Sequence, residues 1–327
     1  MILTPIIHAK FGYTPAFMIC GLGLIIGLIY FATKLPEFKS MGSPADFKPL
    51  TMSTIIPVAM VILSLTLFAG FLLSNLLYAK ILIFSTVVFV VSMFAYFYYT
   101  LPSVEGNKVL AILILLFLTA IFFSMQLQMF GVLNIFIDKH VDRTFFGYVI
   151  PAGNYAALNG FWVAVLGPVI AKFYIHMESK KKVMSIASRF ASGILIASSA
   201  FYLLSTSHWF VSTGTVSSMW IVVSYFIISF GEILVSALGL ALICKLAPPK
   251  LTTLFMGSFL LALAIGGWVS GIIGHWIVIP EGVTHMQTML IAYNHAFLNV
   301  GHMSLITGII AVLLIPYISR LTGERTK

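Results

Sequence analysis

The chain has 327 residues, of which 60% are hydrophobic and only 8% are charged, and its mean hydropathy is +1.08. A soluble domain of this length could not solvate such a surface, so the composition excludes a soluble globular protein and indicates a polytopic membrane protein. The formal net charge of +9 does not indicate nucleic-acid binding, because the basic residues cluster at the ends of apolar segments.

Nine apolar segments are each long enough to cross a bilayer, and each is predicted to be a helix because a helix satisfies its own backbone in lipid. In chain order they are residues 15–34, 54–75, 80–100, 109–137, 156–175, 186–205, 218–244, 251–279 and 289–318. Proline and glycine interrupt the connections between them, for example at Pro36, Pro44 and Pro248. The sequence therefore predicts an all-α protein with about nine transmembrane helices.

The lysine and arginine residues predict the orientation of these helices. All but four of the 18 fall at one set of alternate connections, which we therefore place in the cytoplasm; the four exceptions are Lys10, Lys80, Lys139 and Arg143. With nine spans, the carboxyl terminus is then inside and the amino terminus outside. The first residues lack the features of a cleaved signal peptide, so the first span itself is expected to direct insertion.

Glu232 lies inside an otherwise uncharged apolar run, residues 222–242, whereas the other acidic residues fall in or beside polar connections. A carboxylate at membrane depth is costly, so it usually faces a cavity or a partner and marks a site for protons, ions or substrate. Ser229, Ser236 and Gly239 follow the same helical face at spacings of three and four. A carboxyl group that exchanges a proton near neutrality suits proton coupling or amine binding. The alternative is a hydrogen-bonded glutamic acid that only holds helices together.

Amide side chains mark two further segments. Gln126, Gln128 and Asn134 lie in the fourth segment, where amides more often join helices than bind ligands. Asn159 is about one turn inside the fifth segment and could both donate to and accept from a ligand.

The remaining patterned residues indicate packing rather than chemistry. Gly267, Gly271 and Gly274 in the eighth segment are predicted to form a ridge where a neighbouring helix packs closely. Cys20 and Cys244 offer neither a metal-ligand spacing nor a disulfide framework. No metal cluster, phosphate-binding loop or nucleophile–base pair is recognisable, so we predict neither a metal site nor an enzyme.

These residues resemble the carboxyl-terminal half of the bacterial proton-dependent oligopeptide transporters, a family of the major facilitator superfamily. Three stretches carry the resemblance: Ser229-Phe230-Gly231-Glu232-Ile233-Leu234, similar to the family's tenth-helix motif Ser-x-Gly-Glu-Leu; Leu158-Asn159-Gly160-Phe161-Trp162, similar to the eighth-helix Leu-Asn-Pro-Phe-Trp; and Met256-Gly257-Ser258-Phe259, similar to the eleventh-helix Met-Gly-x-Trp. The stretch from Phe122-Phe123 through Gln128 to Leu133, Asn134 and Phe136 is also similar to the seventh helix.

The resemblance implies a division of the chain. Residues 1–35 would hold the family's sixth helix, and residues 36–108 a cytoplasmic linker followed by an inserted, lipid-facing two-helix hairpin. Residues 109–327 would form the carboxyl-terminal six-helix bundle, helices seven to twelve.

The resemblance also implies a function: proton-coupled transport of di- and tripeptides across the cytoplasmic (inner) membrane, with protons as the coupling ion and no other cofactor. Glu232 would engage the peptide's amino terminus and couple protons, and Asn159 and Gln128 would hold backbone or terminal groups. Ser236 and Phe259 would line the same pocket.

Departures from the family pattern bear on this function. Phe259 replaces a tryptophan, Gly160 replaces a proline, and Leu127 occupies a position where several members carry an acidic residue. The first-helix motif Glu-x-x-Glu-Arg-Phe-x-Tyr-Tyr is absent from these residues.

An outside amino terminus with an uncleaved first helix is unusual for a complete transporter, so we expect that further sequence once preceded residue 1. Transport would then need a separate polypeptide supplying the amino-terminal bundle, because alternating access requires two bundles around one site. A truncated, non-transporting remnant and a membrane scaffold protein are the alternatives.

Overall fold

The computed structural model describes residues 3–38, 51–180, 184–211, 214–276 and 286–323. The chain divides into two compact units, Ile7–Val90 and a larger unit made mainly of Val91–Lys327.

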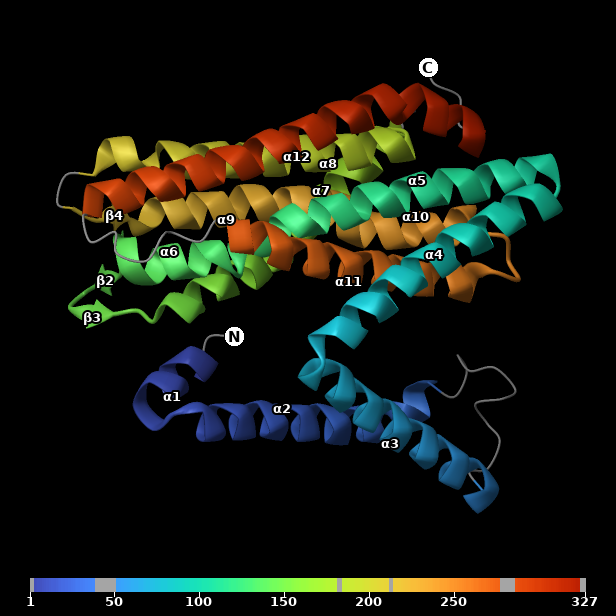
Figure 1. Ribbon diagram of the computed structural model, residues 1–327, viewed down its shortest axis with the longest axis horizontal. Coiled ribbons are helices and arrows are strands. Elements are labelled where there is room, and N and C mark those ends of the chain that lie inside the picture. Colours follow the sequence, from blue (N-terminus) through green and yellow to red (C-terminus); the bar gives the residue numbers. More distant parts are fainter. Residues whose placement is uncertain (1–2, 39–50, 181–183, 212–213, 277–285, 324–327) are drawn as a thin grey trace. The chain divides into compact units, whose positions relative to one another are not determined.

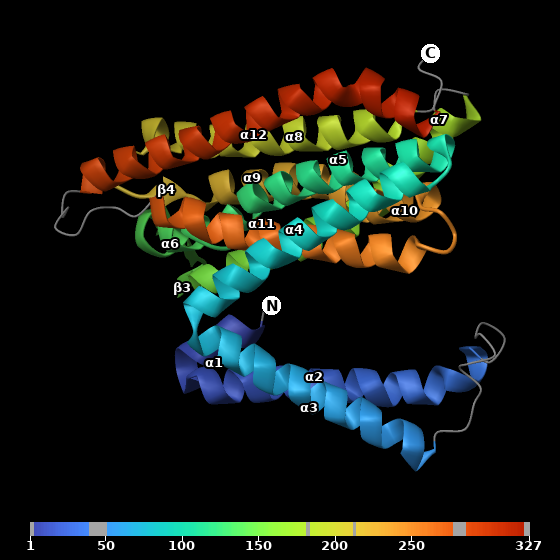
Figure 2. The ribbon, with the colours of Figure 1, turned by 45° about the vertical axis from the view of Figure 1, so that its right-hand side comes forward.

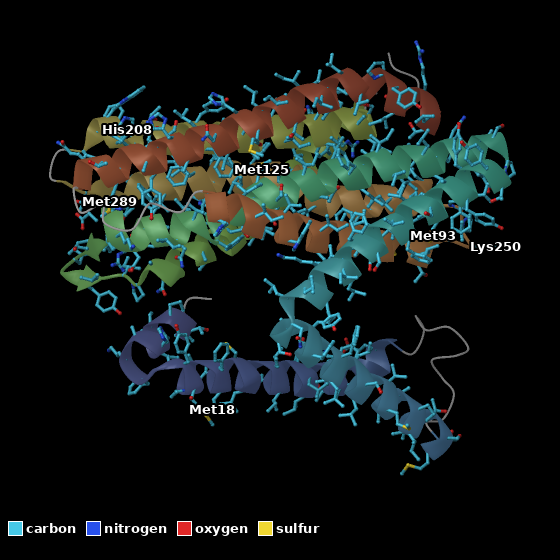
Figure 3. The ribbon with its side chains drawn as sticks, in the orientation of Figure 1. Met18, Met93, Met125, His208, Lys250 and Met289 are labelled. Atoms are coloured by element: carbon cyan, nitrogen blue, oxygen red, sulfur yellow. The ribbon has the colours of Figure 1, made fainter. Side chains whose placement is uncertain are left out.

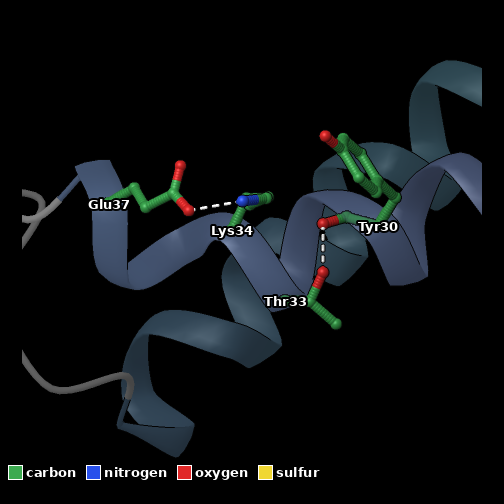
Figure 4. Close-up of polar contacts among 4 residues, drawn as sticks. All are labelled: Tyr30, Thr33, Lys34 and Glu37. Atoms are coloured by element: carbon green, nitrogen blue, oxygen red, sulfur yellow. Dashed lines mark hydrogen bonds and ion pairs between the residues drawn. The ribbon is translucent and has the colours of Figure 1, made fainter.

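The smaller unit contains the long apolar helices α2 (Tyr13–Lys34) and α3 (Met52–Ser74). It also contains the end of the short helix α1 (Leu3–Phe11) and the first part of α4 (Leu76–Thr100). The break between α1 and α2 falls at Gly12, whose φ of 83° is a conformation that suits glycine. At the other end of α2, Lys34 forms an ion pair with Glu37 and the Thr33 hydroxyl donates to the Tyr30 carbonyl (Figure 4). Polar side chains thus gather where this apolar helix ends.

The larger unit is a bundle of long helices (Figures 1 and 2). Its helices are α5 (Ser103–Gln126), α6 (Val132–His140), α7 (Ala157–Ser179), α8 (Ile186–Thr206), α9 (Ser218–Glu232), α10 (Leu238–Leu246), α11 (Thr252–Trp276) and α12 (Met286–Thr322). Short strands join some helix ends: β1 (Val141–Asp142) pairs in parallel with β4 (Val216–Ser217), and β2 (Thr144–Phe145) pairs antiparallel with β3 (Tyr148–Val149).

Among the described residues, nine helical stretches are long and apolar enough to cross a membrane, which confirms the predicted all-α, nine-span architecture. Two of the nine are interrupted. The fourth span consists of α5 and α6, separated by a 3-10 turn, η2 (Leu127–Met129). The seventh consists of α9 and α10, joined through a π-helical turn, η5 (Ile233–Ala237). The sequence did not predict either interruption.

The bundle is packed around α5 and α8, in each of which more than half of the residues are buried. Helix α12 lies along α8 in both views, and α11 lies along α5 (Figures 1 and 2). Met125 is 4% exposed and lies inside the bundle, whereas His208 and Lys250 mark its opposite ends (Figure 3). Apolar side chains on the outer helix faces are exposed, as expected for surfaces that meet lipid.

Helices α8 and α9 approach each other closely at a pair of glycines, Gly193 and Gly231. A Cβ atom on Gly231 would lie 2.5 Å from the carbonyl oxygen of Gly193, and one on Gly193 would lie 2.8 Å from that of Gly231. Helices α8 and α9 therefore touch backbone to backbone beside Glu232.

The predicted glycine ridge on α11 is partly wrong. The close approach occurs at Gly266, where a Cβ atom would lie 2.8 Å from the Ala120 carbonyl oxygen on α5, whereas one on Gly271 would meet nothing within 4 Å. Gly267 and Gly274 make ordinary contacts with Leu127 and Gln128. The close approach to α5 thus falls one residue before the first glycine of the predicted ridge.

Candidate functional site

Three polar residues come together where helices end. Gln126 is the last residue of α5, Glu232 is the last residue of α9, and Asn159 is in the first turn of α7. Interrupted helices are common at the binding sites of secondary transporters, because irregular backbone at membrane depth is tolerated beside a cavity or inside protein. The two interruptions thus coincide with the residue that the sequence singled out.

The carboxyl group of Glu232 is held by two amides. Asn159 Nδ2 lies 2.7 Å from Glu232 Oε2, and Gln126 Nε2 lies 2.9 Å from the same oxygen. Asn159 Nδ2 also lies 3.1 Å from the Ser229 hydroxyl, which is fully buried. Glu232 and Asn159, which the sequence indicated separately as site residues, are therefore joined by a direct hydrogen bond. The other oxygen, Oε1, accepts no hydrogen bond from the described residues.

Glu232 is half-buried, so its unbonded oxygen is not sealed in the protein interior. Within the described residues it forms no ion pair: the two recorded pairs are Lys34 with Glu37 and Arg143 with Asp138. The site therefore presents a carboxyl oxygen without a cation beside it.

Gln128 is not brought to this cluster. Its Nε2 lies 2.8 Å from the Ser270 carbonyl oxygen and 2.9 Å from the Ser270 hydroxyl, and the side chain is 2% exposed. The Tyr225 hydroxyl donates to the Met129 carbonyl 2.9 Å away. Gln128 thus has the packing role that the sequence left open, and Tyr225 bonds the backbone at the same break between α5 and α6.

The two remaining candidates, Ser236 and Phe259, make no hydrogen bond to the amides that hold Glu232. Ser236 is half-buried in η5, one turn after Glu232, and makes no hydrogen bond to the described residues. Phe259 on α11 is 2% exposed, and its ring lies 3.5 Å from where a Cβ atom on Gly239 would be. Its side chain packs against α10 and is covered in this structure.

Gln126 was noted in the sequence as an amide of the fourth span but was not among the predicted site residues. On an uninterrupted helix, the side chains of Gln126 and Gln128 would point in directions about 200° apart. Their spacing alone does not indicate which of the two faces Glu232. Both side chains are 2% exposed, so their hydrogen-bond partners distinguish them: Gln126 donates to Glu232, whereas Gln128 donates to Ser270.

A helical bundle with a carboxyl group between interrupted spans is the architecture expected of the secondary-transporter class. The family model PTR2, described as the POT family, matches residues 1–289, so the chain belongs to the POT family. The resemblance drawn from the sequence is thereby confirmed.

Relatives include dipeptide and tripeptide permease A of Erwinia pyrifoliae, which is 31% identical over 328 residues, covering 99% of this chain and 65% of the relative. Dipeptide and tripeptide permease B of Photorhabdus asymbiotica is 29% identical over 327 residues, covering 99% of this chain and 67% of the relative. The chain thus spans about two thirds of the length of these relatives.

Solved structures give the same result. The crystal structure of tetrameric PepTSo2 is similar with a TM-score of 0.80 and 26% identity, covering 98% of this chain and 68% of that one. A bacterial homologue of the human drug peptide transporters PepT1 and PepT2 is similar with a TM-score of 0.79, 27% identity and the same coverage. The apolar helices and the permease relatives make this chain a multi-pass inner-membrane protein of a transporter family.

Proposed function

We propose that the chain is the carboxyl-terminal part of a proton-coupled di- and tripeptide transporter and works with a separate amino-terminal bundle. One observation carries this proposal: Glu232 offers a carboxyl oxygen without a described partner, while Asn159 and Gln126 hold the other oxygen. The permease names of the relatives and their greater length support the substrate class and the need for a further bundle.

In this mechanism the ionised Glu232 attracts the ammonium group of a peptide. Asn159 and Gln126 both donate to Oε2, so they orient the carboxylate and leave Oε1 for the ligand. A proton on Glu232 removes its negative charge and weakens its hold on the ammonium group. Protonation and peptide binding therefore oppose each other at one oxygen, which is the chemistry that proton coupling requires.

The other site residues shape this pocket. Ser236 would contribute a hydroxyl one turn beyond Glu232, and Phe259 would form an apolar wall once the bundles move apart. The contacts support Gln126, in place of Gln128, as the amide that assists Glu232.

We further propose that residues 1–35 hold the family's sixth helix, residues 36–108 the linker and inserted hairpin, and residues 109–327 the six-helix bundle. The amino terminus lies outside and the carboxyl terminus in the cytoplasm, as the lysine and arginine residues indicate. Lipid surrounds the outer faces, and protons are the only coupling ion.

The test is reconstituted uptake. The chain is placed in liposomes with a matching amino-terminal bundle, and accumulation of a labelled dipeptide is followed under an inward proton gradient. We expect the unmodified chain to support uptake and Glu232→Gln to abolish it. The control is Glu105→Gln, which changes a carboxyl group in the first turn of α5 and should leave uptake intact. Uptake that survives Glu232→Gln would contradict the role of Glu232. Failure of every amino-terminal bundle to support uptake would contradict the transporter proposal and favour a remnant or scaffold.

A further inference from the structure

A cavity of about 630 Å³ opens at the end of the bundle that His208 marks in Figure 3. It lies between β2, the start of α7 and the start of α9. Its lining includes polar groups and aromatic rings: Asp142, Phe145, Asn154, Tyr155, Phe210 and Ser218. The lysine and arginine residues predict that this end faces outside, and its volume is in the range of small-ligand sites.

Two charged side chains line this cavity, Asp142 and Arg143, and of the two only Asp142 lacks an ion-pair partner among the described residues. Arg143 also lines the cavity, but its guanidinium lies 3.1 Å from Asp138 Oδ1 and donates to the carbonyl oxygens of Asp138 and Ile150. Asp142 forms no ion pair among the described residues. Its Oδ1 accepts the Thr144 N–H at 2.9 Å, which leaves Oδ2 without a described donor.

The uncharged polar groups also present acceptors. The Ser218 hydroxyl donates to the Asp142 carbonyl, so the Tyr155 hydroxyl, 2.6 Å from Ser218 Oγ, is the donor in that pair. The Tyr155 oxygen therefore keeps its lone pairs for a ligand. Asn154 Oδ1 is buried and receives no hydrogen bond from the described residues. Unsatisfied buried acceptors are costly, so a cavity of this kind favours a cationic donor.

Aromatic rings flank these acceptors. Phe145 is 63% exposed and Phe210 is 65% exposed, so both present apolar surface to a ligand. A primary ammonium group offers three N–H donors and is attracted to carboxylates and to ring faces. The set of acceptors and rings matches a small ligand with an ammonium group at one end and an apolar side chain beside it.

We propose that this cavity binds the amino-terminal ammonium group of a di- or tripeptide, as an outer site separate from Glu232. The identification of the ligand as a peptide rests on the proposed function. Val222, also on the cavity wall, is ten residues before Glu232, which is about 15 Å along a helix. An extended dipeptide spans only about 7 Å, so one dipeptide cannot occupy both sites and binding there is a separate event.

Calorimetric titration of the full chain in lipid nanodiscs tests this site without any amino-terminal bundle. The probes are dialanine, N-acetyl-dialanine, which lacks the ammonium group, and ethylamine, a bare amine. The variant is Asp142→Asn, whose side-chain oxygen still accepts the Thr144 N–H, and the comparison variant is Glu232→Gln. We expect Asp142→Asn to weaken dialanine binding at the outer site roughly tenfold or more, since it removes a charged hydrogen bond, and Glu232→Gln to leave it unchanged.

N-acetyl-dialanine should not bind there, and ethylamine should bind weakly and compete with dialanine. Equal binding of dialanine to Asp142→Asn and the unmodified chain, or equal binding of the acetylated peptide, overturns the outer site. Dialanine binding lost only in Glu232→Gln overturns the outer site and leaves the proposed function standing. A third outcome separates the two proposals: dialanine binding depends on Asp142, but no amino-terminal bundle gives uptake. That result would support the outer site and contradict the transport proposal.

Discussion

Asn159 Nδ2 lies 2.7 Å from Glu232 Oε2, so a single hydrogen bond joins the first turn of α7 to the last residue of α9. The same nitrogen lies 3.1 Å from the buried Ser229 hydroxyl. The amide is therefore fixed by α9 at two points, and the orientation of the carboxylate depends on it.

Replacing Asn159 with alanine should weaken peptide binding and uptake in the reconstituted transporter. A hydrogen bond to a charged group is worth about 1.5–3 kcal/mol, so we expect at least a tenfold fall in apparent affinity. Gly160→Ala, one residue on, is the matched control because a Cβ atom there meets nothing within 4 Å. Concentration dependence of dipeptide uptake measures both. Equal losses from the two variants would mean that α7 itself, and not the amide, is disturbed.

The two glutamines at the end of α5 should have different roles: Gln126 should affect proton coupling and Gln128 should affect stability. Gln126→Leu removes a donor to Glu232 and should change the pH dependence of uptake, with a small effect on stability. Gln128→Leu removes the contacts to Ser270 and should lower the unfolding free energy by about 1 kcal/mol, with the pH profile unchanged. Uptake against pH and thermal unfolding in detergent are the two measurements. A shifted pH profile in Gln128→Leu alone would reverse the assignment.

Much of this architecture was predictable because membrane helices are selected by hydropathy, which is read directly from sequence. The nine spans agree with the described helices. Glu232 was also predictable, since a single carboxylate in a long apolar run stands out. Asn159 followed from its motif in α7, and its hydrogen bond to Glu232 gives that motif a physical meaning.

The choice between Gln126 and Gln128 was not predictable, because it depends on where α5 stops. The 3-10 turn η2 changes the rotation of the chain within three residues, and no proline or glycine lies at Leu127–Met129 to announce it. Bonds from other helices, such as that from Tyr225 to the Met129 carbonyl, help to hold the break. Spacing along one helix contains no information about such partners.

The glycine contact between α8 and α9 should be intolerant of a methyl group. A Cβ atom on Gly231 would lie 2.5 Å from the Gly193 carbonyl oxygen and 2.9 Å from the Ala197 side chain, so the helices would have to separate. Gly231→Ala should lower the unfolding free energy by about 1–3 kcal/mol and, because Glu232 is the next residue, also reduce peptide binding.

Thermal unfolding in detergent checks this prediction, with Gly271→Ala as the control. A Cβ atom on Gly271 meets nothing within 4 Å, and alanine favours a helix over glycine by about 0.5–1 kcal/mol. The control should therefore unfold at the same temperature as the unmodified chain or slightly higher. If Gly231→Ala unfolded at the same temperature as the control, the result would contradict a close contact between α8 and α9.

Phe146 is strained, and removing the strain should stabilise the protein. It occupies the turn between β2 and β3 with φ of 48°, a left-handed conformation that is uncommon for a bulky residue, and its side chain is 95% exposed. Glycine adopts this conformation without a steric cost, and few packing contacts would be lost. Phe146→Gly should therefore raise the unfolding free energy in detergent by up to about 1 kcal/mol. Tyr148→Gly, in strand β3 of the same hairpin, has no such strain to relieve and should not stabilise. A lower unfolding temperature for Phe146→Gly would show that the exposed ring contributes more to the hairpin than its backbone strain costs.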